Sequence, residues 1–253
     1  MVEVNVWLYG LASVFVVSLI SLIGVITLSV KIKKLEKVLI YLVSLSAGAL
    51  FGGAFLHLLP EVIKETGFNL KISYFILGGI VLFFILEKII HWHHCHSPTH
   101  KGHPQIHRFA IMNLIGDGFH NFLDGLIIGA SYLISIPVGI ATTLAVALHE
   151  IPQEIGDFGV LLKGGFSKTK ALLWNFSSAL ISFLGLILAF ILGNIIENVH
   201  LFLVPIAIGG FIYIAGSDLI PELNREFTVK RSIWQLIIFI LGILIMAVLL
   251  LLD

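Results

Sequence analysis

Residues 109–134 read FAIMNLIGDGFHNFLDGLIIGASYLI, and residues 138–162 read VGIATTLAVALHEIPQEIGDFGVLL. Each stretch is long enough for a helix that crosses the hydrocarbon core of a bilayer, which takes about 20 mostly apolar residues. Each stretch also carries histidine and acidic residues near its middle. Apolar length combined with ionisable groups at this depth predicts membrane helices that carry functional side chains.

The composition of the whole chain supports a membrane protein. Of its 253 residues, 58% are hydrophobic and 12% are charged, and the mean hydropathy is +1.06. Soluble domains have about 25% charged residues. The formal net charge is zero, which argues against binding to nucleic acid. The single cysteine, Cys95, excludes a disulfide framework and a cysteine-rich zinc finger.

The distribution of apolar residues predicts an all-α, polytopic protein with eight transmembrane helices. The expected spans cover residues 6–30, 38–63, 72–90, 109–134, 138–162, 171–195, 201–223 and 233–252. Residues 1–253 then form a single transmembrane domain, and residues 91–107 form its one extended polar loop. The 24 glycines suit close packing of helices in lipid.

The basic residues predict an orientation. Thirteen of the fifteen Lys and Arg residues fall in the odd-numbered loops, when Lys88 at the end of the third span is counted with the loop that follows it. Because Lys and Arg concentrate in cytoplasmic loops, both termini are expected outside the cytoplasm.

Acidic residues within the spans are the strongest functional signal. Apart from Glu87, which lies beside Lys88 at the end of the third span, eight of the fifteen acids lie there: Glu61, Asp117, Asp124, Glu150, Glu154, Asp157, Asp218 and Glu222. A charge near mid-bilayer costs about 2.5–3.5 kcal/mol even on insertion scales. No Lys or Arg lies deep in a span to pair with them, so protons, water or bound cations must neutralise them.

Two of the spans bring these groups to the same depth. In the fourth span, Asp117, His120, Asn121 and Asp124 share one helical face. In the fifth span, His149, Gln153 and Asp157 share a face, with Glu150 and Glu154 on the adjoining stripe. A short turn makes the two spans antiparallel neighbours, so these groups are expected to meet at the midplane. Imidazole, carboxylate and amide oxygen suit Zn²⁺, Fe²⁺ or Mn²⁺. The candidate metal ligands are His120, Asn121, Asp124, His149, Glu150 and Gln153.

Proline in the fifth span is expected to kink its helix next to His149. Pro152 cannot donate a backbone hydrogen bond, so the Leu148 carbonyl is expected to be left free to face a cavity.

Other ionisable residues are candidates for a path or a gate. Asp117, Glu154 and Asp157 are expected on the cytoplasmic side of the midplane, either as an acidic track or as hydrogen-bonded packing groups. The pairs His57–Glu61 and Asp218–Glu222, in HLLPE and DLIPE, lie near span ends, where Pro60 and Pro221 are expected to kink the helices. They are gates or auxiliary sites, or side chains that reach the interface.

The third loop carries a histidine cluster, HWHHCHSPTHKGHPQIH. Such a composition is typical either of weak metal binding or of a solvated linker. The candidate ligands in this loop are His93, His94, His96, His100 and His103.

The motifs HNFLDG and HEIPQEIGD, each central in a span, resemble those of the ZIP family of divalent metal transporters, in particular the subfamily with the HExPHExxD-type motif. The resemblance implies a ZIP-like bundle in which spans one, four, five and six move against spans two, three, seven and eight. It implies transport of Zn²⁺, and also Fe²⁺ or Mn²⁺, toward the cytoplasm by alternating access. His120, Asp124 and His149 match ligands of a first metal, and Asn121 and Glu150 match positions of a second.

The sequence also departs from this pattern. Gln153 stands where many members have glutamate and where the HExPHExxD-type subfamily has histidine, which weakens a binuclear centre. The sixth span offers Ser178 and Ser182 but no acid. The resemblance also implies a homodimer. The short termini fit a location in a plasma membrane, and no cofactor is expected apart from the transported cation.

Alternative functions remain open at this point. They are metal efflux by proton exchange, a metal sensor without transport, and an intramembrane metalloprotease. The protease reading depends on the likeness of HEIPQ to the HExxH zinc helix, but the second histidine is replaced by Gln153. The expected function is therefore transport and not an enzymatic activity.

Overall fold

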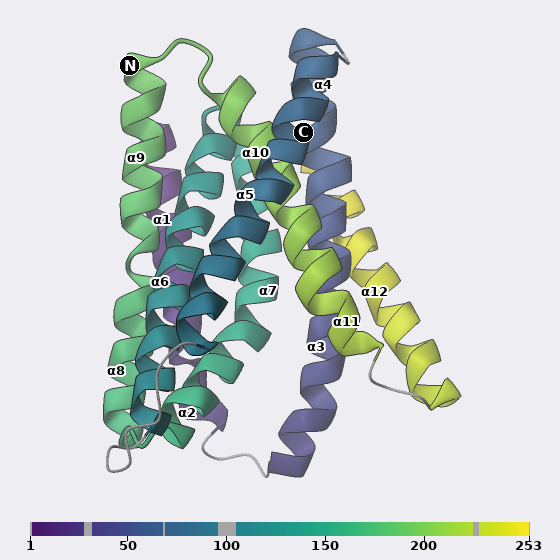
Figure 1. Ribbon diagram of the computed structural model, residues 1–253. Helices are drawn as coiled ribbons and strands as arrows, with labels where there is room; N and C mark the ends of the chain where they lie inside the picture. Colours follow the sequence, from purple (N-terminus) through teal and green to yellow (C-terminus); the bar gives the residue numbers. More distant parts are fainter. Residues whose placement is uncertain (1, 28–31, 68, 96–104, 225–227, 253) are drawn as a thin grey trace.

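The computed structural model describes residues 2–27, 32–67, 69–95, 105–224 and 228–252, and every regular element among them is helical (Figure 1). Six stretches are long and apolar enough to cross a membrane by length and composition: Val4–Ile23, Val38–Thr66, Leu70–Lys88, Lys168–Ile195, His200–Leu223 and Val229–Leu249. The chain is therefore a helical, multi-pass membrane protein.

The helices follow one another along the chain with short connections. The α-helices are α1 (Val4–Ile20), α2 (Gly24–Thr27), α3 (Ile32–Gly52), α4 (Leu59–Thr66), α5 (Leu70–Cys95), α6 (Gln105–Tyr132), α7 (Ile136–Lys163), α8 (Lys168–Ala179), α9 (Ser182–Ile195), α10 (His200–Tyr213), α11 (Ile220–Leu223) and α12 (Val229–Leu249). Short 3₁₀ segments are η1 (Ser21–Ile23) and η4 (Leu250–Leu252), and π-helical segments are η2 (Gly53–Leu58) and η3 (Ile214–Leu219).

The helices form two groups that meet along one interface. In the first group, α6 packs against α7, α8 and α9, and α1 packs against α7 and α9. In the second group, α3 packs against α12, and α5 packs against α10. The main contact between the groups is that of α3 with α7, with smaller contacts of α6 with α5 and α10. The two groups match the division of spans that the family resemblance implies.

Reciprocal glycines hold three helix pairs at close range. A Cβ added to any of these glycines would collide with the backbone of the partner helix, so only glycine permits the observed approach. The pairs are Gly48 with Gly242 (α3 and α12), Gly79 with Gly209 (α5 and α10), and Gly125 with Gly185 (α6 and α9). The predicted role of glycine in close packing is confirmed at these contacts.

Proline widens two of the helices. The π-helical segments η2 and η3 end one residue before the short helices that contain Pro60 and Pro221, α4 and α11. Proline cannot donate to the carbonyl four residues earlier and its ring crowds that carbonyl, and a wider turn relieves both problems. The sequence correctly marks both sites as irregular.

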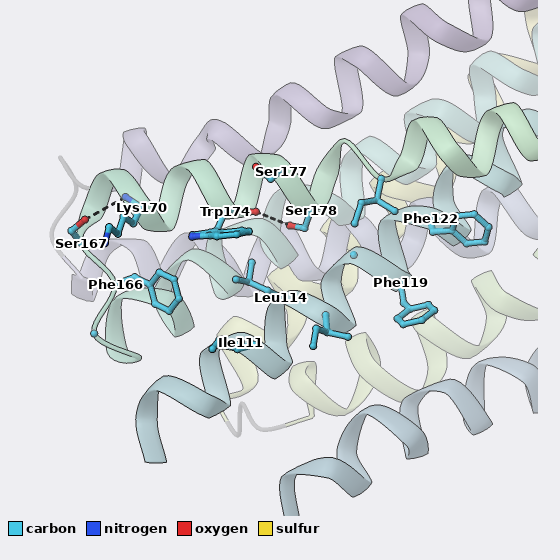
Figure 2. A pocket seen from close by; sticks show the side chains of 14 residues that line it. Ile111, Leu114, Phe119, Phe122, Phe166, Ser167, Lys170, Trp174, Ser177 and Ser178 are labelled. Atoms are coloured by element: carbon cyan, nitrogen blue, oxygen red, sulfur yellow. Dashed lines mark hydrogen bonds between the residues drawn. The ribbon is translucent and has the colours of Figure 1, made fainter. Parts of the chain in front are cut away.

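The predicted sixth span is divided in two. Helix α8 ends at Ala179 and α9 begins at Ser182. The hydroxyls of Ser18 and Ser182 both donate to the Ala179 carbonyl, at 3.0 and 2.7 Å, and so occupy an acceptor of the helix. Below this break α8 and α6 separate, and a cavity lies between them (Figure 2).

Two predicted boundaries need correction. The first span was expected to reach residue 30 as one helix, but α1 ends at Ile20 and passes into η1 and α2. The polar loop was expected over residues 91–107, but α5 continues to Cys95 and α6 begins at Gln105.

Candidate metal site

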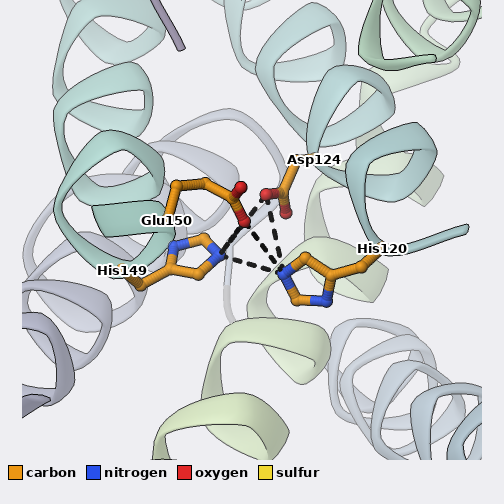
Figure 3. A group of neighbouring side chains, drawn as sticks. All are labelled: His120, Asp124, His149 and Glu150. Carbon is orange, nitrogen blue, oxygen red and sulfur yellow. Dashed lines mark hydrogen bonds and ion pairs between the residues drawn. The ribbon is translucent and has the colours of Figure 1, made fainter. Parts of the chain in front are cut away.

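Four ionisable side chains from two helices converge inside the bundle (Figure 3). Helix α6 supplies His120 and Asp124, one turn apart, and α7 supplies the adjacent residues His149 and Glu150. Asp124, His149 and Glu150 are buried to 1% exposure or less, and His120 is half-buried. The sequence correctly predicts that these four residues face one another.

The two imidazole nitrogens lie close to each other and to both carboxylates, at distances near those between ligands of a tetrahedral metal ion. His149 Nε2 lies 3.1 Å from His120 Nε2, 3.3 Å from Asp124 Oδ2 and 3.6 Å from Glu150 Oε1. His120 Nε2 lies 3.7 Å from Asp124 Oδ2 and 3.5 Å from Glu150 Oε1. Ligands about 2.0 Å from a tetrahedral Zn²⁺ are about 3.3 Å from one another. The group could hold one such ion with little movement.

The other nitrogen of His149 orients its ring. Nδ1 lies 3.3 Å from the carbonyl oxygen of Ala145 on the same helix. A carbonyl only accepts, so Nδ1 carries the proton and donates. In the neutral ring, Nε2 then turns a lone pair toward the cluster, as in metal-binding histidines whose second nitrogen donates to a carbonyl.

The acidic members of the cluster are short of donors. Neither oxygen of Asp124 has a hydrogen-bond partner among the described residues, and neither does Glu150 Oε1. No described Lys or Arg forms an ion pair with either carboxylate; the basic side chains close to them are the two histidines, which carry a charge only when protonated. A buried carboxylate in this situation needs a proton or a cation.

The expected free carbonyl next to Pro152 is not free. Pro152 lies inside α7, which continues through it. The hydroxyl of Ser46, on α3, lies 2.6 Å from the Leu148 carbonyl oxygen and 2.8 Å from the Leu42 carbonyl oxygen of its own helix. Its proton, directed to the nearer oxygen, supplies the donor that the backbone lacks at Pro152. The prediction that this carbonyl faces a cavity is wrong, and the bond instead joins the two helix groups.

Two further candidate ligands have other positions. Asn121 is fully buried and its amide donates to Asp117, at 3.1 Å to the carbonyl and 2.8 Å to Oδ1. Its own Oδ1 has no partner among the described residues. Gln153 is half-buried one turn beyond His149, and no hydrogen bond joins its side chain to another described residue. Neither belongs to the four-atom group.

Three acids extend beyond the cluster on the same helices. Asp117 accepts from the Ser178 hydroxyl, Glu154 accepts from the Asn175 amide, and Asp157 accepts from the Asn113 amide at 2.8 Å. Asp117 thus accepts on both oxygens, from Asn121 and from Ser178. Glu154 and Asp157 are each held on one oxygen, while Glu154 Oε1 and Asp157 Oδ2 have no partner among the described residues.

Sequence reasoning missed two of these partners. Asn113 and Asn175 were not singled out, although Asn113 lies one turn before Asp117 and Asn175 lies three residues before Ser178. Polar amides in apolar spans were the available signal.

The remaining candidates lie elsewhere. His57 Nε2 lies 2.7 Å from the Met246 carbonyl oxygen on α12, and Glu61 pairs with Lys64 at 3.3 Å near the surface. Asp218 is exposed in η3, and Glu222 is half-exposed in α11.

The loop histidines stay a prediction. His93 and His94 belong to the last turn of α5, and His96, His100 and His103 lie outside the described residues.

Comparison with known proteins gives the chain its relatives. The family model described as ZIP Zinc transporter matches residues 4–109 and 96–250. Zinc transporter ZIP13 of Pongo abelii is 34% identical over 81% of this chain and 65% of that protein. Metal cation symporter ZIP14 of Xenopus tropicalis is 32% identical over 87% of this chain and 62% of that protein. Zinc transporter ZIP10 of Homo sapiens is 39% identical over 55% of this chain and 18% of that protein.

The chain spans less than two thirds of the length of each of these relatives. The family model nevertheless covers almost all of the chain, including α6 and α7 with their His–carboxylate cluster. The chain therefore belongs to the ZIP zinc transporter family.

Proposed function

We propose that the chain transports a divalent metal ion, foremost Zn²⁺, through the cluster of His120, Asp124, His149 and Glu150. The observation that carries the proposal is the convergence of four ligand atoms, all within 4.8 Å of one another, in a buried site without a Lys or Arg partner among the described residues. The transported ion would supply the positive charge that the carboxylates lack.

The number of spans and the orientation belong to this proposal. Helices α6 and α7, each of 28 residues, add two crossings to the six stretches that meet the length and composition of a span. An even count agrees with the start of α1 and the end of α12 at the same end of the bundle (Figure 1). Both termini would lie outside the cytoplasm, in the plasma membrane, and a homodimer is the assembly that the family resemblance favours.

Transport toward the cytoplasm would use alternating access between the two helix groups. The ligands all come from α6 and α7, in the first group, so the site can move as a unit against α3, α5, α10 and α12. Asp117, Glu154 and Asp157 would receive the ion on the cytoplasmic side, because two of them keep an unpartnered oxygen. Gln153 departs from the HExPHExxD-type motif, and we propose a mononuclear site.

The arrangement supports transport over proteolysis. An HExxH protease places both zinc histidines on one helix and keeps its glutamate as a general base. Here the second histidine comes from another helix. Glu150 Oε1 lies 3.5 Å and 3.6 Å from the Nε2 atoms of the two imidazoles, so it can bind the same ion as they do. The named relatives are transporters or symporters. Proton-coupled efflux differs from the proposal only in direction, which flux experiments decide.

The test is radioactive zinc flux in proteoliposomes with the protein in a known orientation. Saturable flux into the compartment facing the α7–α8 loop is expected, with competition by Fe²⁺ or Mn²⁺. Replacing His120 by alanine should abolish it, since a four-ligand site loses a quarter of its ligands. Flux only in the reverse direction would replace uptake with efflux, and normal flux in the variant would contradict the site.

A further inference from the structure

A long apolar cavity lies between α6 and α8, apart from the metal cluster (Figure 2). Its volume is about 1170 Å³, slightly above the roughly 300–1,000 Å³ that is typical of small-molecule pockets. Ile111, Ile115 and Phe119 line it from α6, and Trp174 lines it from α8. These four side chains are 42–54% exposed, so the cavity is open to the outside of the helix bundle.

The cavity results from a change in helix packing. Above it, α6 and α9 touch at Gly125 and Gly185, where a side chain on either glycine would meet the opposite backbone. Below the break between Ala179 and Ser182, α8 follows a separate course. Large side chains line the space there, and the cavity is therefore built into the fold at this helix break.

The dimensions of the cavity fit a lipid chain. The residues of α6 that line it run from Ile111 to Phe122. At 1.5 Å per residue this stretch is about 16 Å long. One leaflet of a bilayer has a hydrocarbon thickness of about 15 Å, half of the total of about 30 Å. The cavity therefore extends through one leaflet, from the start of α8 toward the middle of the membrane.

One end of the cavity is basic. Ser167 and Lys170 line it at the start of α8, and Lys168 is exposed beside them. In sequence, residues 105–110 and 163–171 include Arg108 and Lys163 as well and contain no Asp or Glu. A basic cluster at the level of lipid headgroups favours anionic phospholipid over zwitterionic lipid.

We propose that this cavity binds an anionic phospholipid, with an acyl chain along α6 and α8 and the phosphate beside Lys170. The bound lipid would also lie close to the polar interior of the protein, because one residue of the cavity wall contacts a buried acid. Ser178 lines the cavity and also donates to Asp117, one of the acids beyond the metal cluster. A bound chain would thus lie against the contact that joins α8 to the acidic residues of α6.

The test uses native mass spectrometry of the full chain with phosphatidylglycerol and phosphatidylcholine of identical acyl chains. Phosphatidylglycerol should bind more tightly, and Lys170→Glu should weaken it about tenfold or more, because a charge reversal removes one attraction and adds a repulsion. The control is Lys71→Glu, an exposed lysine in the first turn of α5, which should leave binding unchanged. This measurement does not depend on metal transport, so it stands if the proposed function fails.

A second pair of variants tests the acyl chain. Ser177→Phe fills the cavity, whereas Gly78→Phe adds the same ring at an exposed site with open space around it. Lipid with brominated chains should quench Trp174 fluorescence, and Ser177→Phe alone should relieve the quenching, with Trp174→Phe identifying the signal. Equal binding of both lipids, or full quenching in Ser177→Phe, would overturn the proposal. Loss of a dimer in Ser177→Phe without loss of lipid would instead make the cavity a contact between two copies, and would also overturn it.

Discussion

His149 and His57 are both buried histidines followed by a proline three residues later, but their partners differ. His57 Nε2 lies 2.7 Å from the Met246 carbonyl, which can only accept, so this nitrogen carries the proton and donates. His149 donates a hydrogen bond through Nδ1 to the Ala145 carbonyl, and its Nε2 faces another imidazole and two carboxylates. The groups that surround the imidazole, and not the residue type or the nearby proline, therefore distinguish a packing histidine from a candidate ligand.

Replacing each of these two histidines by alanine should affect a different property of the protein. His149→Ala should reduce zinc flux by more than the roughly 10–100-fold that is typical of residues supporting a metal ligand, because it removes a ligand itself. His57→Ala should keep the apparent zinc KM and lower stability instead, because it removes a buried hydrogen bond to the backbone. Zinc flux in proteoliposomes and thermal unfolding measure the two effects. Equal losses of flux in both variants would remove the distinction.

Asp124 in the cluster and Glu61 near the surface allow the same comparison for carboxylates. Asp124→Asn should raise the apparent zinc KM at least about tenfold, because a neutral amide oxygen is a weaker ligand for Zn²⁺ than a carboxylate. Glu61→Gln is the matched control, since Glu61 pairs with Lys64 near the surface and an exposed pair contributes about 0–1 kcal/mol. Its KM should stay within experimental error of the unmodified protein. An unchanged KM in Asp124→Asn would contradict the assignment of this carboxylate.

The hydrogen bond from Ser46 to Leu148 tests how the site is supported. Ser46→Ala should cost about 1–3 kcal/mol, because it leaves the partly buried Leu148 carbonyl, one turn before Pro152, without a donor. Ser44→Ala is the control, because the Ser44 hydroxyl only donates to Ile40 within its own helix. Denaturant unfolding in detergent compares the two variants. The same loss in both would mean that the Leu148 carbonyl needs no partner from α3.

The cluster itself was accessible from sequence for a simple geometric reason. Residues spaced three or four apart on a helix share a face, and a short turn makes adjacent helices antiparallel. His120 and Asp124 therefore had to lie at the depth of His149 and Glu150 once both spans were recognised. The helices themselves followed from apolar length, and Pro60 and Pro221 marked the irregular turns.

Other features depend on partners that are distant in sequence. Ser46 is 102 residues from Leu148, and no local pattern announces that it replaces the donor missing at Pro152. The division of α8 from α9 arises from hydroxyls on two helices that compete for the Ala179 carbonyl. Asn175 meets Glu154 only because α8 packs on α7. Such contacts are set by tertiary packing, which spacing along one helix does not contain.

X-ray absorption spectroscopy of Zn²⁺ bound to the full chain tests most directly whether the cluster of His120, Asp124, His149 and Glu150 binds the ion. The loop histidines would first be replaced by alanine so that they cannot contribute. We expect one zinc per chain with mixed nitrogen and oxygen ligands at about 2.0–2.1 Å, two of them imidazoles. This signal should persist in His57→Ala and disappear in the combined His120→Ala and His149→Ala variant. If the double variant still bound one zinc per chain through two imidazoles, His120 and His149 would not be the zinc ligands.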